Sequence, residues 1–323
     1  MQADMYDAGG GARYLVPGVR YSVPGVGGWG LGVVAVWILT CLIWSTVWLF
    51  IKLGVRDVPP VSFAAVRLVI AILVMAPVVW AMKTPLPRTW RQWRLILGTG
   101  FLLLGVNYGL LFWGAQFISS GLMAVLQSVT PAMALVFAHY LLHDEPMTTR
   151  KMGGLLLGAA GIAVIYWDQL NFGGRALTGS IAVTAAAVCV AYAYVMMRRS
   201  GRDLHPSVIT SGQMVAGLVP LMTYALAVDG NPLEIRWTRT ALVAVAYLAV
   251  MGSVLAAWLN YWLLPRVGAV NLLIMGLVEP PIAIALGAWY LSERLNARML
   301  AGSALILLSV WLTMARRREM VES

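Results

Sequence analysis

One acidic side chain stands out because it lies near the middle of a long apolar run. Glu279 belongs to the stretch 277–281 and is followed directly by Pro280 and Pro281. Proline cannot donate the backbone hydrogen bond of a regular helix, so a kink is expected here. Ionisable groups and broken helices inside a bilayer mark pathways and sites. Glu279 is therefore a candidate for binding a substrate amine or coupling to protons; the alternative is a structural acceptor at the kink.

A second charge within an apolar run is Arg67, in the run 61–82. It lies about two helical turns from the outer end of that run, so its long stem can carry the guanidinium to the interface. We favour this position. The alternative is an inward Arg67 that pairs with Glu279 or holds a substrate carboxylate through two hydrogen bonds. Arg67 and Glu279 are the two coupling candidates.

Amide and phenol side chains share helical faces in three other runs. Asn107 and Tyr108 lie together in the run 95–117, and Asn260 and Tyr261 occupy the corresponding face of the run 240–264. Gln127 lies in the run 121–142. Because amides are costly against lipid, these faces are expected to point inward. There the side chains either bridge helices or line a substrate cavity.

Aromatic side chains near the middle of two runs suggest a cavity lining. Trp44 and Trp48 are four residues apart on one face of the run 31–51, and Tyr192 lies in the matching region of the run 178–197. Aromatic residues at the ends of spans usually form an interfacial belt. A deeper position suits a wall that holds an apolar side chain, or an ammonium group through cation-π attraction.

A histidine pair raises the question of a metal site. His139 and His143 are four residues apart, with Asp144 and Glu145 adjacent. Two imidazoles on one helical face can bind zinc, but histidines at the end of a helix also satisfy its last carbonyls. We favour the second interpretation and predict neither a metal nor another cofactor.

The composition determines which elements must position these residues. Of 323 residues, 60% are hydrophobic and only 11% are charged, against about 25% charged in a soluble domain. Apolar runs of the roughly 20 residues needed to cross a bilayer occur ten times, at 31–51, 61–82, 95–117, 121–142, 149–167, 178–197, 207–228, 240–264, 268–291 and 296–315. The sequence predicts an all-α membrane protein with ten transmembrane helices and no soluble catalytic or nucleic-acid-binding module.

The basic residues are dispersed among short loops, which explains the net charge of +10 by membrane orientation and not by nucleic-acid binding. Loops on the side of the two termini carry roughly twice as many lysines and arginines as loops on the other side. Because cytoplasmic loops are enriched in these residues, both termini are predicted to be cytoplasmic.

Prolines and basic residues recur at similar places in the two halves of the chain. Pro60 is matched by Pro206, Pro131 by Pro280, and Lys52 by Arg198, at offsets of 146 to 149 residues. Each copy holds five spans, so the copies insert with opposite orientation and form an inverted repeat, the usual basis of alternating access. We predict a mobile cytoplasmic tail at 1–30, repeats at 31–170 and 171–316, and a cytoplasmic tail at 317–323. Pro131 and Pro280 are candidate hinges.

These features resemble the drug/metabolite transporter superfamily, specifically its ten-helix EamA-type exporters. The resemblance covers roughly residues 31–316 and rests on Trp44-Ser45 with Lys52, Pro60 with Arg67, the proline-bearing fourth and ninth spans, and Glu145 and Glu293. It implies a central cavity lined by spans one, three, four, six, eight and nine. Within the family the chain is most similar to exporters of aromatic and other neutral amino acids. One departure is the turn 143–146, where the usual Gly-Glu pair is replaced.

We therefore expect a secondary transporter in the bacterial inner membrane that exports small amphiphilic metabolites, in particular neutral or aromatic amino acids. No ATP-binding motif is present, so a gradient would supply the energy. Multidrug efflux is the first alternative; exchange of phosphorylated metabolites would need more cavity cations than Arg67. The sequence also leaves open an integral membrane enzyme that uses Glu279 or the histidine pair, and a helical scaffold or receptor that transports nothing.

Overall fold

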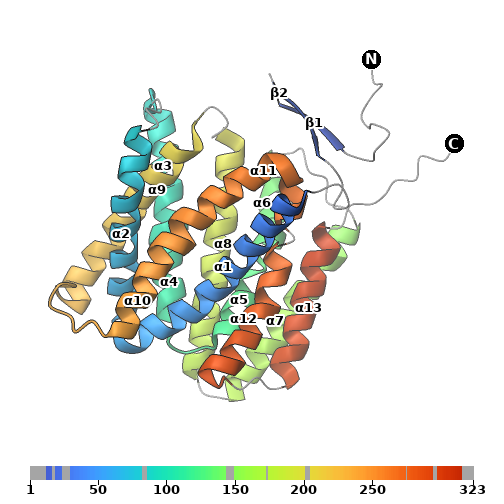
Figure 1. Ribbon diagram of the computed structural model, residues 1–323. Helices are drawn as coiled ribbons and strands as arrows, with labels where there is room; N and C mark the ends of the chain where they lie inside the picture. The colour runs from blue at the N-terminus through green and yellow to red at the C-terminus, as the bar shows by residue number, and fades with distance from the viewer. Residues whose placement is uncertain are drawn as a thin grey trace.

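A computed structural model describes residues 12–16, 19–23, 30–81, 86–142, 149–171, 174–200, 204–273, 275–293 and 297–314. Within this part the regular secondary structure is helical apart from one short hairpin. Its strands β1 (Ala12–Val16) and β2 (Val19–Val23) pair antiparallel, with Tyr14 opposite Tyr21. The hairpin lies outside the helical bundle, at one end of it (Figure 1).

Five spans form the first repeat. Three of them are single helices and two are divided, in the order α1 (Leu31–Asp57), α2 (Pro60–Ala81), then α3 (Trp90–Gly100) with the π-helical segment η2 (Phe101–Val106) and α4 (Asn107–Gly114), then α5 (Ser120–Gln127) with α6 (Thr130–Leu142), and finally α7 (Thr149–Asn171).

The second repeat has the same five spans. They are α8 (Gly174–Ser200), then α9 (Pro206–Tyr224) with η3 (Ala225–Asp229), then α10 (Arg239–Tyr247) with η4 (Leu248–Leu255) and α11 (Ala256–Leu273), followed by α12 (Met275–Leu291) and α13 (Ala297–Met314). Seven helices of the described chain are long and apolar enough to cross a membrane, and α12 and α13 are shorter apolar helices. The predicted all-α membrane fold of two inverted five-helix repeats is confirmed.

The local signals that begin the spans also repeat. Pro60 and Pro206 are the first residues of α2 and α9, where the missing N–H of proline costs nothing. Hydroxyl side chains cap other spans: Thr89 forms a capping box with Gln92 at α3, and Ser119 accepts a backbone N–H at α5. Each cap satisfies a donor that the first turn leaves free.

The second span of each repeat donates a hydrogen bond to the third span of the other. Arg67 on α2 donates from Nε to Ser253 Oγ in η4 at 3.2 Å. Gln213 on α9 donates from Nε2 to Thr99 Oγ1 in α3 at 2.9 Å. Arg67 and Gln213 are the pair matched by the 146-residue offset. The two repeats are therefore interlocked by reciprocal contacts.

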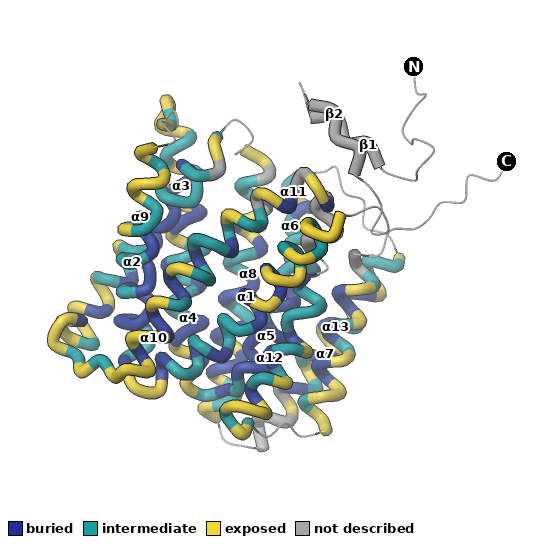
Figure 2. Tube along the Cα trace, in the orientation of Figure 1, coloured by how far each residue is buried: buried dark blue, intermediate teal, exposed yellow. Residues whose placement is uncertain are grey.

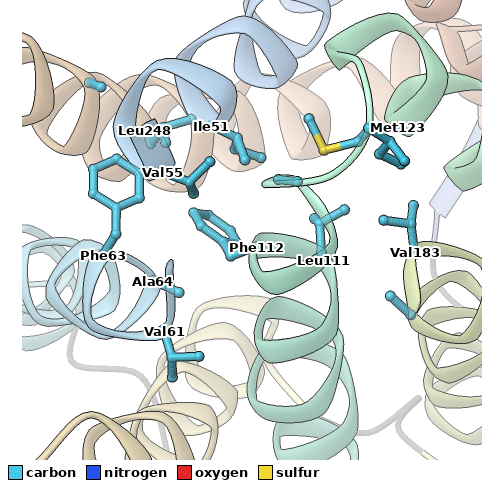
Figure 3. Packing of buried hydrophobic residues seen from close by; sticks show 14 of the residues in the cluster. Ile51, Val55, Val61, Phe63, Ala64, Leu111, Phe112, Met123, Val183 and Leu248 are labelled. Carbon is cyan, nitrogen blue, oxygen red and sulfur yellow. The ribbon is translucent and has the colours of Figure 1, made fainter. Parts of the chain in front are cut away.

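Large apolar side chains fill the junction of α1, α2 and α4. In Figure 3, Phe112 of α4 lies near Val55 of α1 and Phe63 of α2, and the rings of Phe63 and Phe112 are 5.8 Å apart between centroids. Figure 2 shows buried residues through the middle of the bundle and exposed ones on its outer faces and ends. This pattern fits a bundle whose outer faces contact lipid.

Helices α7 and α13 lie side by side at one edge of the bundle (Figure 1). Their backbones meet at glycines: a Cβ on Gly161 would lie 2.7 Å from the carbonyl oxygen of Gly302, and a Cβ on Gly302 2.8 Å from that of Gly161. Small residues allow such close approach in membranes. The fifth spans thus brace the two repeats against each other.

Two charged side chains hold the ends of spans at the face opposite the termini. Lys52 Nζ donates to the carbonyls of Ala115 and Ile118 at 2.6 and 2.7 Å. Glu293 accepts from the backbone N–H of Ser120 at 2.9 Å and from its hydroxyl at 2.7 Å. Both contacts satisfy free groups at helix ends.

Candidate functional site

Arg67 lies in the interior of the bundle and not at the interface. Its side chain is 3% exposed. The guanidinium carbon lies 4.7 Å from the ring centroid of Tyr108 and 5.7 Å from that of Phe112. Helix α2 supplies the arginine, α4 supplies both rings, and η4 supplies the hydroxyl of Ser253.

The snorkelled position favoured from the sequence is therefore wrong. Depth in the span allowed either direction, and the two aromatic faces together with Ser253 decide it, because cation-π attraction strengthens where water is excluded. Pairing with Glu279 is also not observed: in the described part of the chain no carboxylate is paired with Arg67. A buried guanidinium that only neutral groups contact has the capacity to hold an anion.

Asn107, the residue before Tyr108, and Gln127 join the third and fourth spans. Asn107 donates from Nδ2 to the Leu103 carbonyl at 3.0 Å and accepts a long hydrogen bond of 3.4 Å from Gln127 Nε2. Asn107 is buried and Gln127 is half-buried. The two amides bridge helices at the base of Tyr108, one of the two roles that the sequence left open.

Trp48 and Glu279 face each other between α1 and α12. The indole of Trp48 lies beside the Glu279 carboxyl, but its Nε1 is buried and makes no hydrogen bond of ordinary geometry. Trp44, one turn earlier, packs with Val278 against a small cluster around Cys41 and Leu263. The two tryptophans thus lie on the face of α1 that meets the second repeat.

Asn260 on α11 carries a second unsatisfied polar atom. Its Oδ1 is buried without a hydrogen-bond partner. Buried polar atoms are nearly always bonded, so such an atom calls for an explanation. Tyr261 belongs to α11 by its backbone, but its side chain lies outside the described residues.

The two hinge candidates differ in local structure. The fourth span is interrupted after Gln127 and resumes as α6 at Thr130, so Pro131 occupies the first turn of the new segment. By contrast, Pro280 and Pro281 lie inside α12, which runs from Met275 to Leu291. Only the first site has the discontinuity that a proline can impose on a span.

Tyr192 lies apart from these residues. Its ring is edge-to-face with Phe137 of α6, with centroids 5.4 Å apart. It lines a cavity of about 820 Å³ between α3 and α8, at the end of the bundle where α3 begins and α8 ends. The sequence predicted a lining role for Tyr192 but did not reveal the residues that surround it there.

The histidine pair gives no metal site in the described residues. His143 and its acidic neighbours lie outside them. In the described part, no group of three His, Cys, Asp or Glu side chains lies close enough to hold a metal ion.

Two features of the site were not predicted from the sequence: its π-helical turns and the hydrogen bond of Ser253 with Arg67. The third and eighth spans both contain π-helical turns, η2 and η4, at corresponding places in the repeats. Ser253 lies in η4 and donates to the carbonyl of Leu248 at 3.1 Å while accepting from Arg67. Such turns are frequent at functional sites, but no single-residue pattern predicts them.

Comparison with known proteins assigns the family. Residues 30–167 and 177–315 each match the EamA-like transporter family. The chain belongs to this family. Membership in a family of transporters sets aside the membrane enzyme and the scaffold and makes the chain a multi-pass membrane protein. The double match agrees with the two repeats seen in the fold.

Individual relatives are distant but cover most of the chain. The uncharacterized transporter YoaV of Bacillus subtilis is 25% identical over 89% of this chain and 98% of its own length. A protein of Escherichia coli named "Probable amino-acid metabolite efflux pump" is 23% identical, over 85% of this chain and 92% of its own length. A solved crystal structure, 19% identical, superposes with a TM-score of 0.60 over 87% of this chain and 97% of its own, a likeness of fold alone.

Proposed function

We propose that this EamA-family transporter exports small amphiphilic metabolites, in particular neutral and aromatic amino acids. Transport would follow alternating access through a cavity between the two repeats, bounded by spans one, three, four, six, eight and nine. The name of the Escherichia coli relative supports the substrate class. The inverted repeat supports the mechanism, since its halves can exchange shapes.

The observation that carries the proposal is a set of interior polar groups whose charge or hydrogen-bonding capacity the described protein groups leave partly unused. Arg67 has no paired carboxylate in the described chain, and Trp48 Nε1 and Asn260 Oδ1 are buried without hydrogen bonds. A ligand with both donor and acceptor groups would satisfy them. An amino acid offers a carboxylate for Arg67, an ammonium for a carbonyl oxygen such as Asn260 Oδ1 or for Glu279, and an apolar side chain for the tryptophans.

The other predicted site residues take roles around this ligand. Trp44, Trp48 and Tyr261 would form aromatic walls, while Asn107, Tyr108 and Gln127 would hold the wall behind Arg67. Tyr192, which lies apart from them in the cavity between α3 and α8, would contact the substrate on its way in. Glu279 would couple transport to protons. Pro131, and more weakly Pro280, would act as hinges when one helical bundle rocks against the other.

Orientation follows from charge. The bias of basic loop residues supports cytoplasmic termini and insertion in a bacterial inner membrane. The residues at 1–30 and 317–323 would then be cytoplasmic tails. The cavity beside Tyr192 would open to the cytoplasm, the side from which an exporter takes its substrate.

Flux into liposomes tests the proposal. Purified protein is reconstituted, and uptake of labelled amino acids is measured with and without a pH gradient. Saturable flux that aromatic amino acids inhibit is expected. If folded protein gives no amino-acid flux above that of empty liposomes but transports cationic dyes, multidrug efflux replaces the proposal.

A further inference from the structure

The cavity between α3 and α8 has a cationic rim. One stripe of α3 faces it with Arg91, Arg94, Leu95 and Gly98, and the last turn of α8 adds Arg199. The four residues of α3 recur at three- and four-residue spacing, which places them on one face of that helix. Three arginines therefore converge from two helices on a space of about 820 Å³, a volume typical of small-molecule sites.

No described residue that lines the cavity is acidic; the lining is completed by Thr89, Gln92, Thr99, Leu102, Tyr192, Met196 and Ser200. Gln92 Oε1, an acceptor in the lining, is already occupied, because it accepts the backbone N–H groups of Arg88 and Thr89. The three arginines are the charged donors that the lining offers to a ligand. The N-terminus of α3 adds the positive end of a helix dipole.

The inner part of the cavity is apolar. Leu95, Leu102 and Met196 form its walls together with the ring of Tyr192. A Cβ on Gly98 would meet no atom within 4 Å, so the space beside this glycine is open. Charge at the rim and apolar surface below it match a ligand with an anionic head and an apolar body.

The rim also lies where such ligands collect. Trp90, the first residue of α3, is 72% exposed, and Trp80, near the end of α2, is 84% exposed. Exposed tryptophans at span ends mark the level of the lipid head groups. The rim is therefore accessible both to soluble anions and to the head group of an anionic lipid.

We infer that the cavity between α3 and α8 binds an anionic head group, phosphate or carboxylate, attached to an apolar body. The head lies among Arg91, Arg94 and Arg199, and the body lies against Leu102, Met196 and Tyr192. This site is separate from the polar groups around Arg67, and its existence does not depend on amino-acid transport.

Binding to protein in phosphatidylcholine nanodiscs tests the inference, with phenyl phosphate and inorganic phosphate as calorimetric probes. Phenyl phosphate is expected to bind more tightly than inorganic phosphate, which lacks the apolar body. The triple variant R91Q/R94Q/R199Q should weaken phenyl phosphate binding at least about tenfold, because each exposed ion pair contributes modestly and the variant removes three of them. The matched control R175Q/R236Q/R239Q removes three exposed arginines at the opposite end and should leave binding unchanged.

A second variant does not alter charge. Gly98→Leu fills the open space beside the α3 backbone and should also weaken binding of phenyl phosphate, while the fold is retained. Size-exclusion chromatography and circular dichroism check folding of each variant. If the triple variant, Gly98→Leu and the control all bind phenyl phosphate as tightly as the wild type, the inference is wrong. Equal affinity for phenyl phosphate and inorganic phosphate would overturn the apolar part of the site.

Nanodiscs that contain phosphatidylglycerol distinguish the source of the ligand. If a lipid occupies the cavity, phosphatidylglycerol will compete with phenyl phosphate, and native mass spectrometry will find it on the wild type but not on the triple variant. If the lipid leaves binding unchanged, the ligand is a soluble anion. Amino-acid flux measured on the same preparations separates this inference from the proposed function. Flux without arginine-dependent binding of phenyl phosphate overturns only the anion site. Binding without amino-acid flux overturns only the proposed transport.

Discussion

Replacing Arg67 with glutamine is the sharpest test of the interior site. The second repeat itself carries an amide, Gln213, at the matching position. Arg67→Gln therefore introduces a side chain that this fold already accommodates in a buried second span, where Gln213 is 6% exposed. The substitution removes the charge and the two-pronged donor but keeps a polar group able to bond Ser253.

The expected loss follows from what Arg67 would offer a substrate. A hydrogen bond to a charged group contributes about 1.5–3 kcal/mol, and every 1.4 kcal/mol changes affinity about tenfold. One such interaction lost with the substrate carboxylate predicts a rise in KM of roughly 10- to 150-fold. Because the guanidinium also stacks on Tyr108 at 4.7 Å, the stability of the variant should fall by no more than about 1–2 kcal/mol.

The assay compares two competitors of labelled phenylalanine uptake in liposomes. Unlabelled phenylalanine carries the carboxylate, and its methyl ester does not. The wild type should prefer phenylalanine by the factor just given, and Arg67→Gln should abolish this preference. Gln213→Met is the matched control, since it removes a buried polar side chain from the same place in the other repeat without touching Arg67.

The reasoning is refuted if Arg67→Gln weakens inhibition by phenylalanine and by its methyl ester to the same extent. The arginine would then act on the shape of the site and not on the carboxylate. An equal effect of Gln213→Met on the preference would refute it as well, because it would trace the change to disturbed packing between the repeats.

Three further predictions concern other positions. Glu279→Gln should abolish the stimulation of flux by an imposed pH gradient while binding persists; gradient-dependent flux in the variant would exclude coupling through this residue. Trp48→Phe removes the unpartnered indole N–H but keeps an aromatic ring, so KM should rise about threefold to tenfold with kcat nearly unchanged; an unaltered KM would remove Trp48 from the site. Gly161→Val forces a side chain against the backbone of Gly302 and should destabilise the protein by about 1–3 kcal/mol, seen as a lower Tm, whereas Gly153→Val in the same helix meets no atom within 4 Å and should not.

The repeat could be predicted because the residues that mark it, such as prolines at helix starts, act locally. Proline at the start of a helix and a long apolar run leave the same mark on the sequence in either orientation. Pro60 and Pro206 accordingly begin α2 and α9. Equivalent spans then had to pack equivalently, which the exchanged hydrogen bonds of Arg67 and Gln213 show.

The direction of Arg67 could not be predicted from its depth. The same stem length permits snorkelling or burial, and the choice depends on partners that lie far apart in sequence: Tyr108 is 41 residues away, and Ser253 is 186 residues away. The cavity beside Tyr192 was missed for a similar reason. In the sequence its arginines are indistinguishable from loop residues that set membrane orientation, and only the packing of α3 beside α8 brings them together.

The two repeats share a fold but differ in charge, and in the proposed mechanism this difference would give the site a direction. The repeat matches Arg67 with Gln213 and Glu279 with Thr130. A cation thus lies on the second span of one repeat, and an acid on the fourth span of the other. Helix α1 lies near both: a Cβ on Gly252 would touch Val47 of α1 and also lie 3.6 Å from Arg67 Nη2, while the next residue, Trp48, faces Glu279.

A symmetric ligand has no use for such an arrangement, whereas a zwitterion does. We expect the carboxylate of an amino acid to point toward Arg67 and its ammonium toward Glu279, with the side chain against α1. If the repeats exchange shapes as proposed, the charges would not exchange with them, because they belong to one copy each. A substrate held at both ends would therefore keep its orientation while the opening changes sides. The ammonium end would then be the part that competes with a proton at Glu279.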